Sequence, residues 1–177
     1  MLKKTSLYLL CLLAGSLLSG CFLFGSDDDQ PRPEPIPPIE QLPPLTSEGK
    51  GTFGCLVNGE PFVSYYPSAL ADYSTNDLIE VSADFRNYQA SIGIGIRPYD
   101  REEMKFDTSR ATMQFNIGND SIDCDYRAWD NIEGWIEINE YNPFEKYVSG
   151  TFEYSAVNEQ CDTIRVTDGR FDLRVIR

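Results

Sequence analysis

Residues 49–177 predict an all-β domain: an antiparallel meander of about nine or ten strands that closes as a β-sandwich or a barrel-like (calycin-like) sandwich. Apolar and polar residues alternate with a period of two through most of this segment, and no long stretch has helical spacing. Asn-Gly and Asp-Gly pairs typical of tight hairpins separate the alternating runs. An open meander would leave its edges unpaired, so we expect closure.

The first two hairpins are predicted from short turn sequences. Asn58-Gly59 marks the first, and Pro61 makes its second arm a short or edge strand, because proline cannot donate to a ladder. The second turns at Asn87-Tyr88. Its inward residues are expected to pair in two facing sets: Ile79, Val81, Ala83 and Phe85 opposite Ala90, Ile92, Ile94 and Ile96. Gly93 and Gly95 then leave a bare strip on the reverse face.

Three more hairpins are expected toward the C-terminus. One turns near Asn119-Asp120, and a longer one joins residues 135–141 to residues 147–157 around Asn142-Pro143. Asp168-Gly169 predicts a final type I′ turn, which pairs Val166 with Phe171 and Ile164 with Leu173. In that register Arg165 lies opposite Asp172 on the exposed face. Residues 64–77 and 98–112 form longer connections, each able to hold a helical turn or a rim loop.

The N-terminus predicts a processing signal rather than part of the fold. Lys3 and Lys4 precede residues 5–17, an almost uncharged apolar stretch with the length of a secretory signal. The following run, Leu18-Ser19-Gly20-Cys21, resembles the bacterial lipobox, in which the thiol is diacylated before cleavage. Residues 1–20 are therefore predicted to be a signal peptide, with Cys21 the lipidation site.

Residues 21–48 predict a proline-rich tether that carries the lipid and holds the domain of residues 49–177 away from the headgroups. Seven of the 27 residues from 22 to 48 are proline, which favours an extended spacer. A proline-rich ligand for a partner is the alternative. Residues 26–29 also resemble the acidic signal that sends some Bacteroidota lipoproteins to the cell surface, but that signal normally lies nearer the cysteine. An outer-membrane location is expected, with the periplasmic and cell-surface faces both open.

The charge and the lack of histidine exclude several functions. After removal of residues 1–20 the chain has 13 Lys and Arg against 28 Asp and Glu, a net charge of −15. Such a chain repels phosphate backbones, so no nucleic-acid partner is expected, and the lipid must supply the membrane contact. Without histidine, Ser-His-Asp and Cys-His catalysis and histidine-rich zinc sites are excluded. No cofactor is predicted.

Three cysteines remain in the exported domain: Cys55, Cys124 and Cys161. In an oxidising compartment we expect one disulfide and one buried thiol, although three reduced core cysteines remain an alternative. The spacing does not choose among the three pairings.

Two segments of the domain resemble an uncharacterised family of Bacteroidota lipoproteins. Residues 52–59 (TFGCLVNG) carry the first part of the resemblance, and residues 150–154 (GTFEY) with residues 162–171 (DTIRVTDGRF) carry the second. It covers both ends of the domain well and its middle loosely. The resemblance implies an anchored small all-β domain and, apart from Cys21, no functional residue.

Two sets of acidic residues are weak candidates for a metal site and for catalytic carboxylates. Asp120, Asp123 and Asp125 are weak candidates for a hard-cation site such as Ca²⁺, but their spacing matches no calcium motif and Arg127 would neutralise them. Glu137 and Glu153 lie on strands predicted to pair, and paired carboxylates are the catalytic groups of glycosidases. Acidic β domains offer such pairs by chance, so we expect no enzyme.

Aromatic residues provide the candidates for ligand binding: Trp129, Trp135, Tyr141, Tyr65 and Tyr66. Trp129 and Trp135 flank an acidic turn, an arrangement that suits sugar rings, although the same residues also suit a core. Tyr65 and Tyr66 are adjacent, so at least one is expected to be exposed. The sequence therefore predicts a lipid-anchored, non-catalytic binding or accessory protein with a glycan or protein partner. A barrel-type carrier of apolar ligands and a small carboxylate-based glycoside hydrolase are the alternatives.

Overall fold

The structure is a computed structural model that describes residues 34–73, 78–96, 104–105, 111–119, 122–127 and 132–176. Contacts divide the chain into Met1–Pro35 and Ile36–Arg177, and every described element lies in the second unit. Two short 3₁₀ helices, η2 (Pro38–Gln41) and η3 (Arg86–Tyr88), accompany the strands. The strands are β1 (Thr52–Val57), β2 (Glu60–Tyr65), β3 (Ala69–Tyr73), β4 (Ile79–Phe85), β5 (Ala90–Ile96), β6 (Met104–Lys105), β7 (Ala111–Asn119), β8 (Ile122–Arg127), β9 (Ile132–Asn142), β10 (Tyr147–Asn158) and β11 (Cys161–Arg174).

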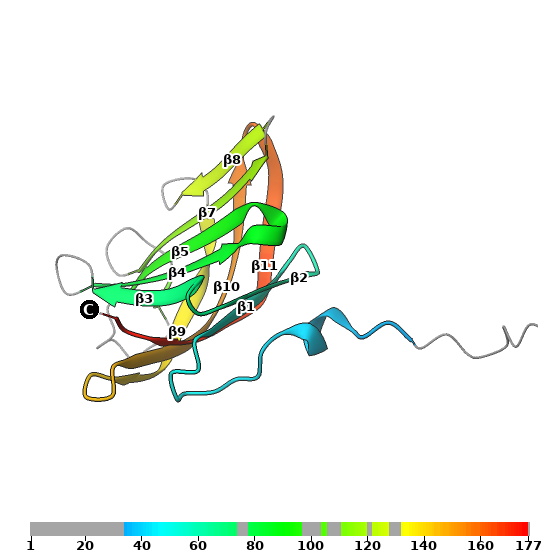
Figure 1. Cartoon of the computed structure of the whole chain (residues 1–177). Helices are drawn as coiled ribbons and strands as arrows, with labels where there is room; N and C mark the ends of the chain where they lie inside the picture. The colour runs from blue at the N-terminus through cyan, green and yellow to red at the C-terminus, as the bar shows by residue number, and fades with distance from the viewer. Residues whose placement is uncertain are drawn as a thin grey trace, which may run out of the picture. The chain divides into compact units, whose positions relative to one another are not determined.

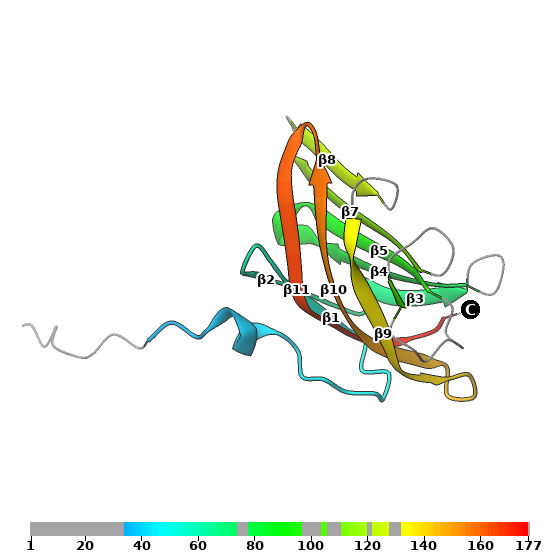
Figure 2. The same cartoon turned by 180° about the vertical axis from the view of Figure 1, so that it is seen from behind.

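The strands form two antiparallel sheets that pack face to face as a β-sandwich (Figure 1). The larger has the order β2-β1-β11-β10-β9-β6 and the smaller has the order β3-β4-β5-β7-β8. Within the described residues β6 has only two residues, so ten longer strands remain, as the alternation predicts. The long strands β9, β10 and β11 form one wall, which faces the viewer in Figure 2. The predicted all-β sandwich is confirmed.

Aromatic and branched side chains fill the space between the sheets. Phe53 is fully buried, and its ring centroid lies 5.9 Å from that of Phe85, 5.4 Å from that of Phe152 and 6.4 Å from that of Phe171. Phe85 belongs to the smaller sheet and the other three rings belong to the larger one, so these contacts hold the layers together. Truncating one such ring to alanine typically costs about 3–5 kcal/mol.

Besides the core contacts and a hydrogen bond from the Ser64 hydroxyl on β2 to the Asp84 carbonyl on β4 (2.9 Å), a backbone bridge and a disulfide join the sheets. Ala71 of β3 bridges Val175 beyond β11, and the Ile176 amide donates to the Ala71 carbonyl at 3.0 Å. The disulfide links Cys124 on β8 to Cys161 at the start of β11. No helix in the described part of the chain is long and apolar enough to cross a membrane.

Two hairpins match the sequence prediction in register. Asn58 and Gly59 both have positive φ and join β1 to β2, with Val57 opposite Glu60. β2 lies at a sheet edge, as Pro61 predicts. β4 and β5 pair Phe85 with Ala90 and Ile79 with Ile96, so the two predicted inward sets face each other.

The hairpins at residues 119–120 and 142–143 also form. Ile117 pairs with Cys124 and Asn119 with Ile122 across β7 and β8, and residues 120–121 between the two strands lie outside the described residues. β9 and β10 pair beside the turn at Asn142, whose side-chain oxygen accepts hydrogen bonds from two following amides.

The predicted final turn at Asp168-Gly169 is wrong. Asp168 has the positive φ (55°) that the turn requires, but β11 continues through it as one strand. Opposite β1 the pairing jumps from Arg170 to Thr167 while β1 advances from Gly54 to Leu56, so β11 holds one extra residue. This is a β-bulge, which uses the same left-handed conformation as the turn.

Because residues 168–169 form a bulge and not a turn, Asp172 has different strand partners from those predicted. It pairs with Thr52 on β1 and Ser149 on β10 instead of with Arg165, and it is 1% exposed. The predicted exposed Arg165–Asp172 pair is therefore wrong. The two long connections are also partly extended rather than helical: residues 64–77 include β3, and residues 98–112 include β6.

Part of the predicted tether packs against the larger sheet. We call residues 42–51 the strap. Leu42 is 7% exposed, and Pro43 lies over Gly54, where an added Cβ would come within 2.5 Å of the proline Cδ. Glycine at position 54 thus lets the strap lie flat on β1. The strap ends at Gly51, whose amide donates to the Asp172 carbonyl at 2.8 Å.

Candidate functional site

A shallow hollow of about 370 Å³ lies on the outer face of β9, β10 and β11. We call it the sheet hollow. It is lined by Glu133, Gly134, Trp135, Glu153, Tyr154, Ser155, Arg165, Val166 and Thr167.

The strand register explains why polar groups gather around Trp135. Trp135 pairs with Glu153 across β9 and β10, and Glu133 pairs with Ser155 in the next outward row. Ser155 in turn pairs with Arg165 on β11. Side chains directly opposite one another on one face lie about 4.5–5.5 Å apart at Cβ. Two carboxylates, a hydroxyl and a guanidinium therefore surround one half-buried indole.

This combination suits recognition of a polar ring. An indole offers a broad apolar face, the carboxylates accept hydrogen bonds from hydroxyls, and Arg165 supplies donors. Backbone hydrogen bonds to both neighbours hold β10, the middle strand of the three, so the groups stand on a rigid support. Sequence reasoning identified Trp135 and Glu153 but missed Arg165 and Ser155, which reach the site only through strand pairing.

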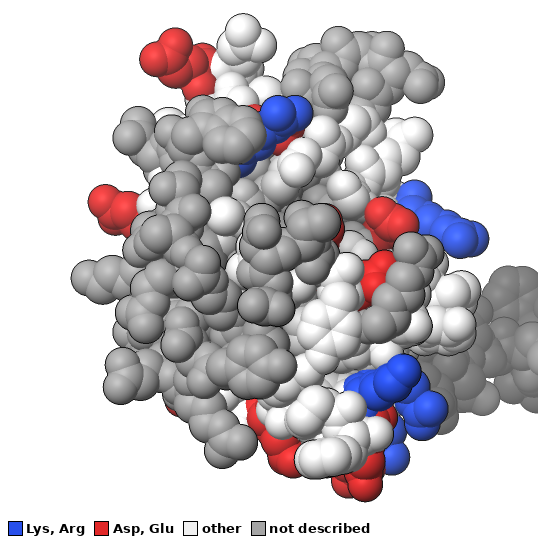
Figure 3. Space-filling model, turned by 90° about the vertical axis from the view of Figure 1, so that its left-hand side faces the viewer, with Lys and Arg blue, Asp and Glu red and all other residues white. Residues whose placement is uncertain are grey.

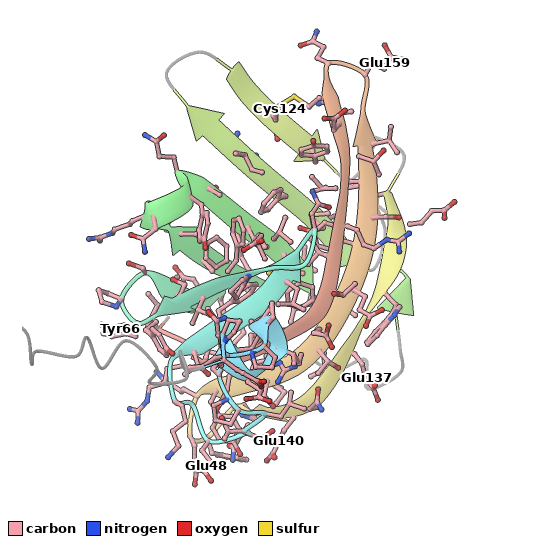
Figure 4. The ribbon with its side chains drawn as sticks, turned by 90° about the vertical axis from the view of Figure 1, so that its right-hand side faces the viewer. Glu48, Tyr66, Cys124, Glu137, Glu140 and Glu159 are labelled. Carbon is pink, nitrogen blue, oxygen red and sulfur yellow. A yellow bond between two sulfur atoms is a disulfide. The ribbon has the colours of Figure 1, made fainter. Side chains whose placement is uncertain are left out.

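Glu137 and Glu153, the two carboxylates of the glycoside hydrolase alternative, lie on the same outer face, but only Glu153 lines the sheet hollow. Glu137 pairs with Thr151, one outward row away from the Trp135–Glu153 pair, and Figure 4 shows its side chain on the outer side of the sheet. Glu153 lines the sheet hollow and Glu137 does not.

The remaining aromatic candidates separate into core and surface. Tyr141 is 8% exposed, and its hydroxyl contacts the Tyr73 hydroxyl, so the proposed ligand-binding role of Tyr141 is corrected to a core role. Tyr65 and Tyr66 are 56% and 64% exposed. Tyr65 lines a depression of about 280 Å³ beside β4. Trp129 lies outside the described residues.

Tyr66 lines a second, larger pocket of about 540 Å³, which we call the strap pocket. The strap contributes Glu48, Gly49, Lys50 and Gly51, and the rest of the lining is Tyr66, Arg174 and Ile176. Figure 4 places Glu48 and Tyr66 at the end of the sandwich opposite Cys124. In Figure 3, Lys and Arg side chains (blue) and Asp and Glu side chains (red) lie close together at the lower end of the molecule.

Asp172 holds the strap in place beside this pocket. One carboxylate oxygen accepts from the Gly49 amide at 2.6 Å, and the other accepts from the Thr46 hydroxyl at 2.6 Å and the Lys50 amide at 3.2 Å. The Glu48 amide lies 3.1 Å from both oxygens. A buried carboxylate requires such donors, because burial removes its hydration.

Of the three weak candidates for a cation site, Asp120, Asp123 and Asp125, the structure describes the side chain of Asp125 alone. Asp125 pairs with the Arg127 guanidinium, the alternative that the sequence raised. Asp120 and the Asp123 side chain lie outside the described residues. In the described part of the chain, no group of three or more potential ligands is placed to hold a metal ion.

The cysteines adopt one disulfide and one thiol. Cys124 and Cys161 are bonded, and Cys55 is a fully buried free thiol in the core. Burial raises the pKa of the Cys55 thiol, which keeps it protonated and chemically inert. Cys21 lies outside the described residues.

No family model, curated protein or solved structure matches this chain.

Proposed function

We propose that this chain is an exported, lipid-anchored, non-catalytic binding protein of the bacterial outer membrane. The support for the anchor is the N-terminal sequence: a basic start, an apolar stretch and a lipobox-like run ending at Cys21. Acylation of Cys21 would supply membrane contact that a chain of net charge −15 does not obtain from anionic lipid surfaces.

We further propose that the ligand is a glycan and that it binds in the sheet hollow. The observation that carries this proposal is the position of Trp135, half-buried among Glu133, Glu153, Ser155 and Arg165 on the outer face of three paired strands. The alternative of an apolar carrier has less support, because large buried side chains such as Phe53 and Phe152 occupy the space between the sheets.

A glycan array tests the ligand class. The mature chain with Cys21→Ser is labelled and applied to bacterial, plant and host glycans, beside the variants Trp135→Ala and Arg165→Gln. We expect retention on a defined glycan set that both variants lose, because one removes the stacking face and the other removes hydrogen-bond donors.

Phe144→Ala is the matched control, since Phe144 is 95% exposed at the β9–β10 turn and does not line the sheet hollow. Circular dichroism of each variant verifies the fold. Arg165 is exposed, so its replacement leaves the core intact. Retention that survives both sheet-hollow substitutions would contradict binding at this site.

A further inference from the structure

We propose that the strap pocket is a second binding site, for a ligand with a carboxylate next to an apolar or ring-shaped body, and that Asp172 positions the strap to form it. This proposal does not depend on glycan binding in the sheet hollow. The two sites share no lining residue.

The strap makes most of the pocket wall. Four of the seven lining residues belong to it. Gly51 has φ +73°, and a Cβ there would lie 2.9 Å from the Tyr66 Cβ, so glycine at position 51 lets the strap approach Tyr66 this closely. The Gly51 carbonyl accepts the Tyr66 amide at 2.9 Å, which fixes the β2–β3 turn against the strap.

Asp172 folds the strap into this wall. The backbone amides of residues 48, 49 and 50 donate hydrogen bonds to its carboxylate, so the strap lies against β11 instead of extending into solvent. A second contact, 2.6 Å between the Ser47 and Ser149 hydroxyls, supports it. If the strap leaves Asp172, the pocket loses Glu48, Gly49, Lys50 and Gly51 together.

The side chains of the pocket favour an anion. Arg174 donates through Nε to the Gly49 carbonyl at 3.2 Å, and its two terminal nitrogens have no partner among the described residues. A guanidinium held this way presents a fork that matches a carboxylate. The lining holds two basic residues and one acidic residue, whereas the whole chain has 15 basic and 28 acidic residues.

The acidic residue of the pocket is already paired. Glu48 and Lys50 lie 2.7 Å apart, and this hydrogen bond raises the pKa of Lys50, so the amine stays cationic. Tyr66 and Ile176 are 64% and 46% exposed and supply apolar surface next to the cations. An anion that carries a ring or a short apolar body would contact both kinds of surface.

Titrations followed by amide NMR test the ligand class. The ¹⁵N-labelled mature chain with Cys21→Ser is titrated with sodium glucuronate and phenylacetate, and with glucose and phenylacetamide as their neutral counterparts. We expect the Gly49 and Gly51 amide signals to shift with the acids and not with the neutral compounds.

Two variants of the pocket test how Arg174 and Lys50 contribute to binding of the acids. Arg174→Gln should weaken binding of the acids about tenfold or more, because it removes a charge-assisted hydrogen-bond pair. Glu48→Gln should strengthen binding, because it releases Lys50. Trp135→Ala should bind the acids as wild type does. Equal shifts with acids and neutral compounds, no shifts with the acids, or unchanged binding by Arg174→Gln would overturn the proposed ligand class.

Asp172→Asn tests the positioning role, with Asp162→Asn on the same strand as the control, since Asp162 is exposed. We expect Asp172→Asn to speed hydrogen exchange at the amides of residues 48–50 and to weaken binding of the acids at least tenfold. Adding Ser47→Cys and Ser149→Cys should form a disulfide that ties the strap to β10 directly. This disulfide should restore slow hydrogen exchange at residues 48–50 and binding of the acids. Unchanged exchange, or wild-type affinity with a released strap, would overturn the role of Asp172.

Discussion

The Cys55 side chain shows how burial sets the chemistry of a single residue. It is fully buried in the core between the two sheets, where desolvation raises its thiol pKa, and thiolate is the reactive form. We therefore expect the folded mature chain with Cys21→Ser not to react with a thiol reagent such as DTNB. In concentrated guanidinium chloride one cysteine per chain should react. Rapid labelling of the folded protein would contradict this placement.

The burial and the hydrogen-bond partners of Asp172 could not be predicted from the sequence. Asp172 lies between Phe171 and Leu173, two core residues, and a buried aspartate needs donors. Those donors lie 122 to 126 residues earlier in the chain, where the predicted tether, expected to be an extended spacer, meets the start of the predicted domain. No local pattern connects the two. A more local error, the assumed turn at residues 168–169, also placed Asp172 on the exposed face.

At the scale of elements, prediction succeeded where the information is local. β4 and β5 are joined by four residues, and their alternating apolar residues fix the register, because a slip of one residue would expose every core side chain. β11 is different. It meets β10 through a two-residue turn at residues 159–160 and pairs on its other side with β1, more than 100 residues earlier in the chain. The Asp-Gly pair at residues 168–169 did not reveal this arrangement, because the same pair suits a turn and a bulge.

The bulge predicts that two substitutions of Asp168 change the free energy of unfolding by different amounts. Asp168 has φ +55°, a conformation that costs a branched side chain at least about 1–2 kcal/mol. We expect Asp168→Val to lower the free energy of unfolding by that amount and Asp168→Gly to stay within about 1 kcal/mol of wild type. Urea denaturation measures both. Equal stability of the Val and Gly variants would contradict a left-handed residue within β11.

At the scale of the whole molecule, alternation predicts two layers but not how their edges meet. The three possible cysteine pairings were indistinguishable by spacing, and the pairing of Cys124 with Cys161 follows from the approach of β8 to the start of β11. The candidate site shows the same limit. Trp135 is visible as a tryptophan among acidic residues, whereas Arg165 joins it only because β10 pairs on both sides.

The disulfide should contribute measurably to holding the layers together. Its cysteines are 37 residues apart, for which the chain-entropy model gives about 4 kcal/mol, at the upper end of the typical range of about 2–4 kcal/mol. We expect Cys124→Ala with Cys161→Ala to lose this amount in chemical denaturation of the mature chain, and wild type in dithiothreitol to match the double variant. Cys55→Ala, which leaves the disulfide intact, controls for loss of a cysteine. A double variant as stable as wild type would contradict the link.

The proposed function rests on acylation of Cys21, which would tie the tether and the sandwich to the membrane. Intact-mass and peptide mass spectrometry of the protein purified from its native membranes tests it most directly. We expect a mature chain that starts at Cys21, carries acyl groups on that residue and lacks residues 1–20. A native chain that retains residues 1–20, or one whose Cys21 carries no acyl group, would contradict the proposed anchor.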